Sequence, residues 1–142
     1  MKISVIISCY NEKATTEKIV EAVRSAAIGR REIIVVDDCS QDGTKAVLEE
    51  KVSQMVDRII YHQVNRGKGA ALRSGFTAAT GDIILVQDAD LEYSPEDYPA
   101  LLEPLVSDKA DAVFGSRVHG WPTASRSFFV AHGRKQVFDA SF

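Results

Sequence analysis

The chain has 142 residues, of which 45% are hydrophobic and 26% charged, as in an ordinary globular domain. Its formal net charge of −3 gives no electrostatic reason to expect nucleic acid as a partner, because nucleic acids favour basic surfaces. No apolar run approaches the roughly 20 residues that a membrane-spanning helix needs. Met1 and Lys2 lead directly into a strand-like segment with no signal-peptide pattern, so we expect a cytoplasmic protein.

Strand-like and helix-like segments alternate along the chain. Short apolar runs indicate buried strands, which we expect at Lys2–Ser8, Glu32–Val36, Arg58–His62, Asp82–Gln87 and Asp111–Gly115. Amphipathic or alanine-rich segments indicate helices between them, at Ala14–Ile28, Asp42–Met55, Gly67–Thr80 and Ser94–Val106. This order predicts an α/β fold, a three-layer α/β/α sandwich built on a mostly parallel, Rossmann-like sheet.

The segment after Gly120 differs in character from the alternating pattern before it. We expect a helix within Ala124–Phe138 and no further strand. The sheet would then end at an exposed edge beside uncovered apolar surface. Because exposed edges and apolar patches promote association, we expect a homodimer or a tendency to aggregate.

Charged and polar clusters directly follow four of the expected strands, as Tyr10–Glu12, Asp37–Asp38, Asp88–Asp90 and Ser116–Arg117. In an open parallel sheet, ligands bind in the crevice outside the carboxyl ends of the strands. Carboxylates delivered there from several separate strands indicate a binding site rather than scattered surface charge.

An Asp-x-Asp triplet is the first candidate for chemistry at this edge. Asp88 and Asp90 follow a buried strand, and Glu92 lies two residues further on. Carboxylate oxygens in such a segment can hold a hard divalent cation such as Mg²⁺ together with substrate phosphates. A polar loop that caps the next helix would contain the same residues, so both interpretations stay open.

Three further side chains at this edge can contact a nucleotide. Asp37 follows the second strand, where Rossmann-type folds bind ribose hydroxyls, whereas Asp42 and Thr44 are better explained as helix caps. Lys68 lies between two glycines at a helix start and can bind an anion there or remain solvated. Arg117 can bind phosphate through its planar guanidinium or pair with an Asp.

The cysteine and histidine residues show no pattern of their own. Cys9 and Cys39 follow neighbouring strands and are best explained as small buried side chains, and a regulatory disulfide between them has no support. The spacing of Cys and His is not that of a zinc site. We expect His62 and His132 at packing or surface positions, and no Ser-His-Asp or Cys-His nucleophile arrangement has support from its sequence context.

Four motifs occur in order along the chain, at Val5–Glu12, Val35–Thr44, Asn65–Ala71 and Gln87–Leu91. Together they resemble the nucleotide-sugar domain of the family 2 glycosyltransferases, which have the GT-A fold. With Gly115–Arg117 they are most similar to the branch of dolichyl- and polyprenyl-phosphate mannose and glucose synthases. The resemblance predicts a nucleotide-sugar domain at residues 1–118 and an atypical final segment of the same domain at residues 119–142.

The resemblance implies a metal-dependent, inverting transfer of a hexose from a nucleoside-diphosphate sugar of the GDP-mannose or UDP-glucose type. The acceptor would be a polyprenyl phosphate, which requires peripheral contact with a membrane, or another hydroxyl. Mg²⁺ or Mn²⁺ would be held by Asp88, Asp90 and Glu92. By motif position, the donor would be bound by Ser8, Tyr10, Glu12, Val35, Asp37, Lys68, Asp88, Ala89, Asp90 and Arg117. The family usually has proline at the position of Ser8.

The chain departs from the family after about residue 118. The family has a longer segment there, which carries acceptor contacts and in many branches the catalytic base. We therefore expect a C-terminally truncated member and assign no base, since no motif places Asp139 at the site. Two hypotheses remain, an active glycosyltransferase and a nucleotide-sugar-binding module that is inactive without its acceptor half.

Two other α/β classes fit the motifs less well. A nucleotidyltransferase would need a glycine-rich basic loop after the first strand, where this chain has Cys9–Lys13. A receiver domain would have its acidic pair after the first strand, whereas Asp37 and Asp38 follow the second.

Overall fold

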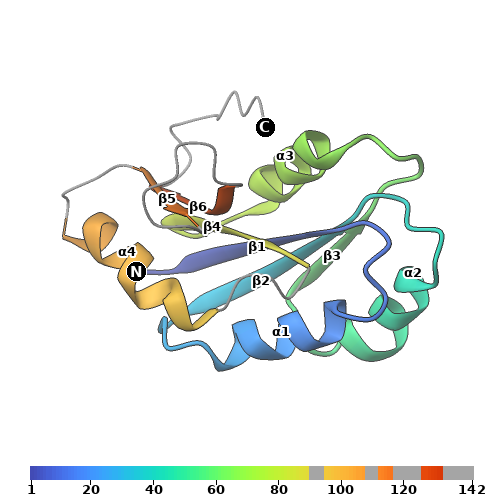
Figure 1. Cartoon of the computed structure of the whole chain (residues 1–142), viewed down its shortest axis with the longest axis horizontal. Coiled ribbons are helices and arrows are strands. Elements are labelled where there is room, and N and C mark those ends of the chain that lie inside the picture. The colour runs from blue at the N-terminus through green and yellow to red at the C-terminus, as the bar shows by residue number, and fades with distance from the viewer. Residues whose placement is uncertain (90–94, 108–111, 117–125, 133–142) are drawn as a thin grey trace.

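Six strands form one sheet, and helices cover both of its faces (Figure 1). The structure, a computed structural model, describes residues 1–89, 95–107, 112–116 and 126–132. The strands are β1 (Ile3–Cys9), β2 (Arg31–Asp37), β3 (Arg58–Tyr61), β4 (Ile83–Asp88), β5 (Ala112–Ser116) and β6 (Arg126–His132). The helices are α1 (Thr16–Ser25), α2 (Thr44–Val47), the π-helical η1 (Leu48–Val52), α3 (Lys68–Ala78), the 3₁₀ turn η2 (Pro95–Asp97) and α4 (Tyr98–Val106).

The sheet has the strand order β3-β2-β1-β4-β6-β5. The strands from β3 to β4 are parallel, which confirms the predicted α/β fold with a mostly parallel sheet. The chain runs outward from β1 to β3 and then crosses to β4 on the other side of β1. This reversal is the kind of point at which open α/β sheets bind ligands.

β6 shows that the helix expected within Ala124–Phe138 is wrong, as is the expectation that no strand follows Asp111–Gly115. A short apolar run such as Phe128–Ala131 fits a strand or a buried helix, and periodicity alone does not separate the two. The partner decides, because β6 lies antiparallel between β4 and β5 and pairs with both. β4 would otherwise present an unpaired edge.

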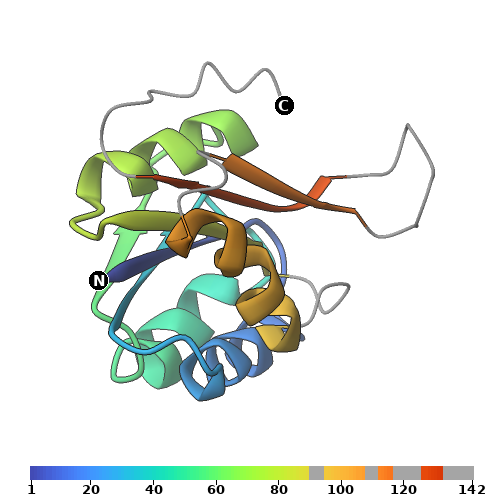
Figure 2. The same cartoon turned by 90° about the vertical axis from the view of Figure 1, so that its left-hand side faces the viewer.

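Side-chain alternation along the strands divides the core into two layers. Val5 and Leu85 pack in one cluster with residues of α1, η1 and α4. Ile6 and Val86 pack in the other cluster with residues of α3. Figure 2 shows the same division, with α3 on one side of the sheet and α1, α2 and α4 on the other. The parallel strands β1, β2 and β4 are therefore covered on both faces, as their continuous apolar sequences predict, whereas the edge strand β3 is only partly buried.

α3 lies close to β1 because Gly75 has no side chain. A Cβ at this position would lie 2.4 Å from Ile6 Cγ2, which is closer than real Cβ contacts. The close approach sets the position of α3 on the sheet. It thereby sets the position of Lys68, the first residue of α3, near the carboxyl ends of the strands.

At the amino ends of the strands, one carboxylate joins β1, β2 and the chain after α3. Glu32 Oε1 accepts hydrogen bonds from the hydroxyls of Ser4 and Thr80 and from the Thr80 N–H. Lys2 Nζ lies 3.3 Å from Glu32 Oε2. Burial raises the pKa of Glu32, but the hydrogen bonds outweigh it and lower the pKa from 4.5 to about 2. The charge at this end of the sheet therefore has all of these partners within the chain, and we refer to the group around Glu32 as the closed end.

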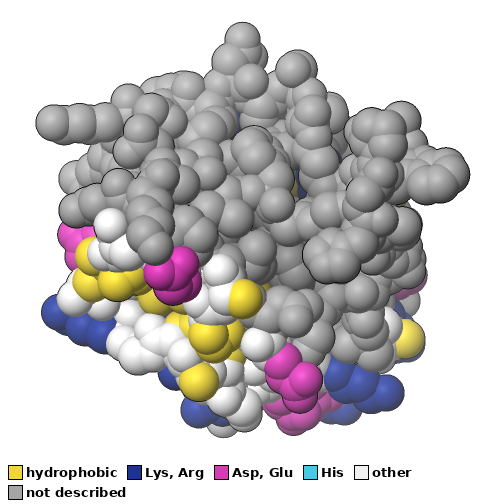
Figure 3. Space-filling view, turned by 60° about the vertical axis from the view of Figure 1, so that its left-hand side comes forward, with side chains coloured by type: hydrophobic (Ala, Val, Ile, Leu, Met, Phe, Trp, Pro, Cys, Tyr) yellow, Lys and Arg dark blue, Asp and Glu magenta, His cyan; other side chains and the backbone are white. Residues whose placement is uncertain are grey.

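Two surface properties bear on the expected partners. No helix within the described residues is long and apolar enough to cross a membrane. Figure 3 shows acidic, basic and hydrophobic side chains interspersed over the described part of one face. The expected homodimer stays a prediction.

Candidate functional site

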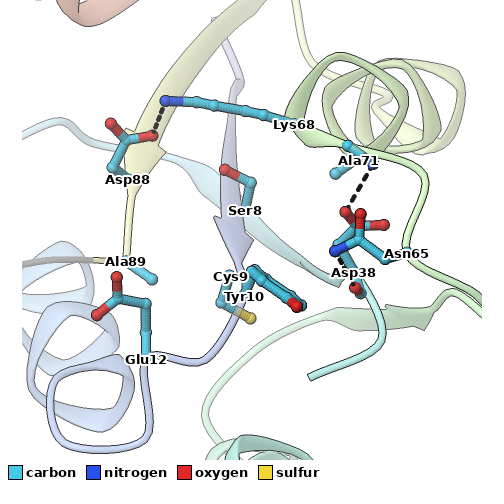
Figure 4. A pocket seen from close by; sticks show the side chains of 11 residues that line it. Ser8, Cys9, Tyr10, Glu12, Asp38, Asn65, Lys68, Ala71, Asp88 and Ala89 are labelled. Carbon is cyan, nitrogen blue, oxygen red and sulfur yellow. Dashed lines mark hydrogen bonds and ion pairs between the residues drawn. The ribbon is translucent and has the colours of Figure 1, made fainter. Parts of the chain in front are cut away.

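A pocket of about 400 Å³ opens at the carboxyl ends of β1, β2 and β4 (Figure 4). It lies where the strand order reverses, at the carboxyl-end edge of the sheet where the sequence predicts a ligand site. Side chains from both loops and helices converge on it. The lining residues are Ser8, Cys9, Tyr10, Glu12, Asp38, Asn65, Gly67, Lys68, Ala71, Asp88 and Ala89.

The structure brings together six of the side chains that the motifs assign to the donor. They are Ser8, Tyr10, Glu12, Lys68, Asp88 and Ala89. Their contact with a donor stays a prediction. Three other predicted residues, Asp90, Glu92 and Arg117, lie outside the described residues, as does Asp139.

Val35 and Asp37 do not line this pocket. Their exposed fractions are 0% and 1%, and the Asp37 carboxylate accepts hydrogen bonds from Ser40. Asp38 lines the pocket in place of Asp37. β2 ends at Asp37. Because side chains alternate between the two faces of a strand, Asp37 lies on the same buried face of the sheet as Val35. Asp38, the next residue, follows the strand and lies at the pocket.

Sequence reasoning also missed Asn65 and Asp38 as pocket residues. Asp38 Oδ1 accepts from the Arg66 N–H at 2.9 Å, and Oδ2 accepts from the Gly67 N–H at 2.8 Å. Asn65 Nδ2 lies 3.4 Å from the Asp38 carbonyl oxygen. The second acid of the pair therefore holds the glycine-rich loop before α3. The adjacent acid pair and that loop were the signals that could have suggested this contact.

An ion pair links the two sides of the pocket. Lys68 Nζ lies 2.6 Å from Asp88 Oδ1, with exposed side-chain fractions of 50% and 19% (Figure 4). A pair this exposed contributes little to folding stability, because water screens it. Its consequence is geometric, since an ammonium group and a carboxylate from separate elements reach the same point in the pocket.

The residues present fit a divalent cation in part. The Asp88 carboxylate is a hard oxygen ligand, and its short contact with Lys68 shows that it faces a position where a cation is favourable. Within the described residues, no group of three or more His, Cys, Asp or Glu side chains is placed to hold a metal ion. A metal site with Asp90 and Glu92 stays a prediction because both lie outside those residues.

The loops after β1 and β2 are tied to each other at the rim of the pocket. The Asn11 N–H donates to Ser40 Oγ at 3.0 Å, and the Gln41 N–H donates to Asn11 Oδ1 at 2.8 Å. The Glu12 N–H donates to Thr44 Oγ1 at 3.1 Å. These bonds fix the segment that presents Tyr10 and Glu12.

Cys9 is not suited to act as a nucleophile here. Cys9 lines the pocket but is buried, and burial together with Asp37 raises the pKa of its thiol. This confirms the expectation of a small buried side chain for Cys9 but not for Cys39. Cys39 is only partly buried, and both thiols are free.

The fold and the pocket define an α/β protein whose candidate ligand site lies where the strand order reverses. Residues 4–125 match the profile of Glycosyl transferase family 2, so the chain belongs to this family. The family resemblance and the GT-A fold expected from the motifs are thereby confirmed.

Two relatives are named as transferases that use dolichol phosphate or undecaprenyl phosphate. A dolichol-phosphate mannosyltransferase of Pyrococcus furiosus is 37% identical, over 86% of this chain and 36% of the relative. An undecaprenyl-phosphate 4-deoxy-4-formamido-L-arabinose transferase of Pectobacterium carotovorum is 39% identical, over 71% of this chain and 32% of the relative. The chain thus spans about a third of these relatives.

Solved structures show the same fold with nucleotides bound. A mannosyltransferase of Pyrobaculum calidifontis, in complex with GDP-Man and Mn²⁺, matches with a TM-score of 0.68 at 27% identity over 78% of this chain and 34% of its own. Glucosyl-3-phosphoglycerate synthase of Mycobacterium tuberculosis, with Mn²⁺, UDP and glucosyl-3-phosphoglycerate, has a TM-score of 0.65 at 27% identity, over 78% of this chain and 42% of its own.

Proposed function

We propose that this chain carries the donor half of a metal-dependent, inverting glycosyltransferase that moves a hexose from a nucleoside-diphosphate sugar to a polyprenyl phosphate. The observation that carries the proposal is the pocket at the strand-order reversal, where Lys68 and Asp88 meet. Membership of the family and the nucleotide complexes of the similar structures support it.

The nucleoside would lie between the loop after β1 and the loop before α3. Tyr10 and Asn65 line this part of the pocket together with Asp38, which lies next to Asn65. Among its described contacts, Asp38 Oδ2 accepts one hydrogen bond, from Gly67, and a carboxylate oxygen can accept two. A base or ribose donor can therefore use Asp38 as an acceptor without breaking the loop.

The diphosphate would lie toward Lys68 and Asp88. Lys68 starts α3, so its ammonium and the helix N-terminus add positive potential on the same side. Asp88, with Asp90 and Glu92 as further predicted ligands, would hold Mg²⁺ or Mn²⁺. When bound, such a metal neutralises charge that develops on the leaving nucleoside diphosphate.

The transfer needs no protein base if the acceptor is a phosphate. A phosphate monoester carries about −1.5 to −2 charge at neutral pH, so its oxygen attacks without first losing a proton to the protein. That oxygen would bond to the anomeric carbon as the bond from this carbon to the diphosphate breaks, which inverts the configuration. The relatives that use dolichol phosphate and undecaprenyl phosphate, by name, support this acceptor class.

The decisive experiment is calorimetric titration of GDP-mannose, UDP-glucose and UDP into the protein, with Mn²⁺ and with EDTA. We expect metal-dependent binding of one donor, and a loss of about a hundredfold in affinity in Asp88→Asn. The matched control is Glu21→Gln, because Glu21 is exposed on α1, away from the pocket. No nucleotide binding by the folded parent protein would overturn the proposal.

Turnover with a polyprenyl phosphate separates the enzyme from the alternative, a nucleotide-sugar-binding module that is inactive alone. The alternative is kept because the chain spans about a third of its relatives. Donor binding without sugar transfer would favour the module, and transfer would favour the enzyme.

A further inference from the structure

His62 connects the strand side of the pocket wall to α3. Its Nδ1 lies 2.8 Å from Asp38 Oδ1, and its Nε2 lies 2.8 Å from Ser74 Oγ. The His62 side chain is 5% exposed, so its contact with Asp38 is buried, whereas the contact with Ser74 is partly buried. The sequence predicted only a packing or surface role for this residue.

The protonation of the group follows from its partners. Burial raises the pKa of Asp38, but hydrogen bonds from Arg66, His62 and Gly67 outweigh it and hold the pKa below its usual range. An ionised carboxylate only accepts, so Nδ1 carries the hydrogen and donates to Asp38. In a neutral ring Nε2 then accepts the hydrogen bond of the Ser74 hydroxyl.

Ser74, His62 and Asp38 are hydrogen-bonded in the same order as a catalytic serine, its base and the acid that orients the base. The position of Ser74 excludes such a catalytic role. Ser74 lies within α3 and is not among the residues that line the pocket. The member of the group that reaches the pocket is Asp38, at the opposite end from the hydroxyl. The group can therefore act on a ligand only through Asp38 and the loop that Asp38 binds.

Asp38 holds the segment that carries three pocket residues, Asn65, Gly67 and Lys68. Its carboxylate receives the Arg66 and Gly67 N–H groups, and Gly67 has a φ of 91°, which favours glycine. Asn65 lies directly before this turn and Lys68 directly after it. A rotation of the Asp38 carboxylate would therefore displace both residues.

We infer that His62 is a positioning residue for the nucleotide pocket, because it fixes Asp38 to α3 and so sets the loop that carries Asn65 and Lys68. The inference rests on the proposed function for the identity of the ligand. It assigns His62 no contact with that ligand.

The test compares His62→Leu, which removes both hydrogen bonds, with His62→Asn, whose amide can still donate to Asp38. We expect affinity for UDP or GDP to fall about tenfold in His62→Leu and to recover to within about threefold in His62→Asn. Mn²⁺ binding measured without nucleotide should change by no more than about threefold in both variants, because Asp88 is linked to this group only through its half-exposed ion pair with Lys68. Equal loss in both variants, or no loss in either, overturns the inference.

A matched control separates positioning from loss of stability. Glu32→Gln weakens the hydrogen-bonded group at the other end of the sheet and should leave nucleotide affinity unchanged. If Glu32→Gln lowers the affinity as much as His62→Leu does, the effect is general destabilisation and the inference is wrong.

A second measurement needs no ligand. Hydrogen exchange at the Arg66 and Gly67 amides should be faster by at least about tenfold in His62→Leu and near the parent rate in His62→Asn. Unchanged exchange in His62→Leu overturns the inference. If the two variants show this exchange pattern but the parent protein binds no nucleotide, only the proposed function is overturned. The two failures are therefore distinguishable.

Discussion

The two ends of the sheet use charged residues in opposite ways. At the amino end, Glu32 is enclosed by partners from the same chain, namely Ser4, Thr80 and Lys2. At the carboxyl end, Lys68 and Asp88 form an ion pair in an open pocket, and the Lys68 side chain is half exposed. The comparison shows that a cluster of charged residues does not by itself identify a site, since the amino end of the sheet, around Glu32, also has ionic contacts. A site shows charged groups whose partners a ligand can replace.

The largest effect on stability is expected at the closed end. Glu32→Gln removes the charge that Lys2 and the Thr80 N–H face, and should lower the free energy of unfolding by about 2 kcal/mol. Urea unfolding of parent and variant measures this difference. Nucleotide affinity should stay unchanged, and a parallel loss of affinity would show that the two ends are not independent.

The same residue predicts the acid behaviour. The pKa of Glu32 is lowered in the folded protein, to about 2 from 4.5, so its contribution is fully present above pH 4.5. It is lost as the pH falls toward about 2. The stability gap between parent and Glu32→Gln should therefore be constant near neutral pH and vanish toward that lower limit. A gap that persists in strong acid would contradict the assignment.

The contrast between the ends also explains what the sequence could predict. The apolar runs gave the four parallel strands and their helices correctly because each pattern is local. β6 was missed because its state depends on the edge of β4, which lies about 40 residues earlier in the chain. The periodicity of a segment does not predict which strands it will pair with.

The candidate site was predictable in outline but not in detail. Motif order pointed to Tyr10, Glu12, Lys68 and Asp88, which line one pocket. The choice between Asp37 and its neighbour depended on where β2 ends. An expected end at Val36 leaves both acids in a loop, whereas the observed end at Asp37 turns that side chain inward.

A smaller effect is expected from Lys68→Gln at the open end. Without nucleotide, removal of the ammonium group frees Asp88 and should raise Mn²⁺ affinity about threefold, as for a half-exposed ion pair. With Mn²⁺ present, affinity for UDP or GDP should fall about fivefold, because the variant lacks the ammonium group that would lie beside the diphosphate. Calorimetry measures both.

The sign reversal is the informative part of this prediction. Lys51→Gln is the control, since Lys51 pairs with Glu17 on η1 and α1, outside the pocket. A change of the same sign in both titrations would mean that Lys68 acts only through general charge, and not by exchanging Asp88 for a phosphate.

The smallest effect on stability concerns backbone strain in the loops beyond the carboxyl ends of the strands. Among the described residues, Asn11 and Cys39 are the non-glycine residues with positive φ, at 54° and 63°, and both lie in loops beyond the carboxyl ends of the strands. A left-handed conformation costs an ordinary side chain about 1 kcal/mol or more, whereas Asn tolerates it. Strain of this kind is expected where loops are shaped for a ligand rather than for stability.

Glycine at these two positions should therefore have opposite effects. Cys39→Gly relieves the strain but adds freedom to the unfolded chain, so a net gain of about 0.5 kcal/mol is expected. Asn11→Gly has little strain to relieve and loses the hydrogen bond from the Gln41 N–H to Asn11 Oδ1, so a net loss of about 1 kcal/mol is expected. Urea unfolding midpoints measure both. If Cys39→Gly also destabilises the protein, the contacts of the Cys39 thiol with Gln41 and Gln63 outweigh the strain, and the left-handed turn is a stabilising part of the loop rather than a cost of the site.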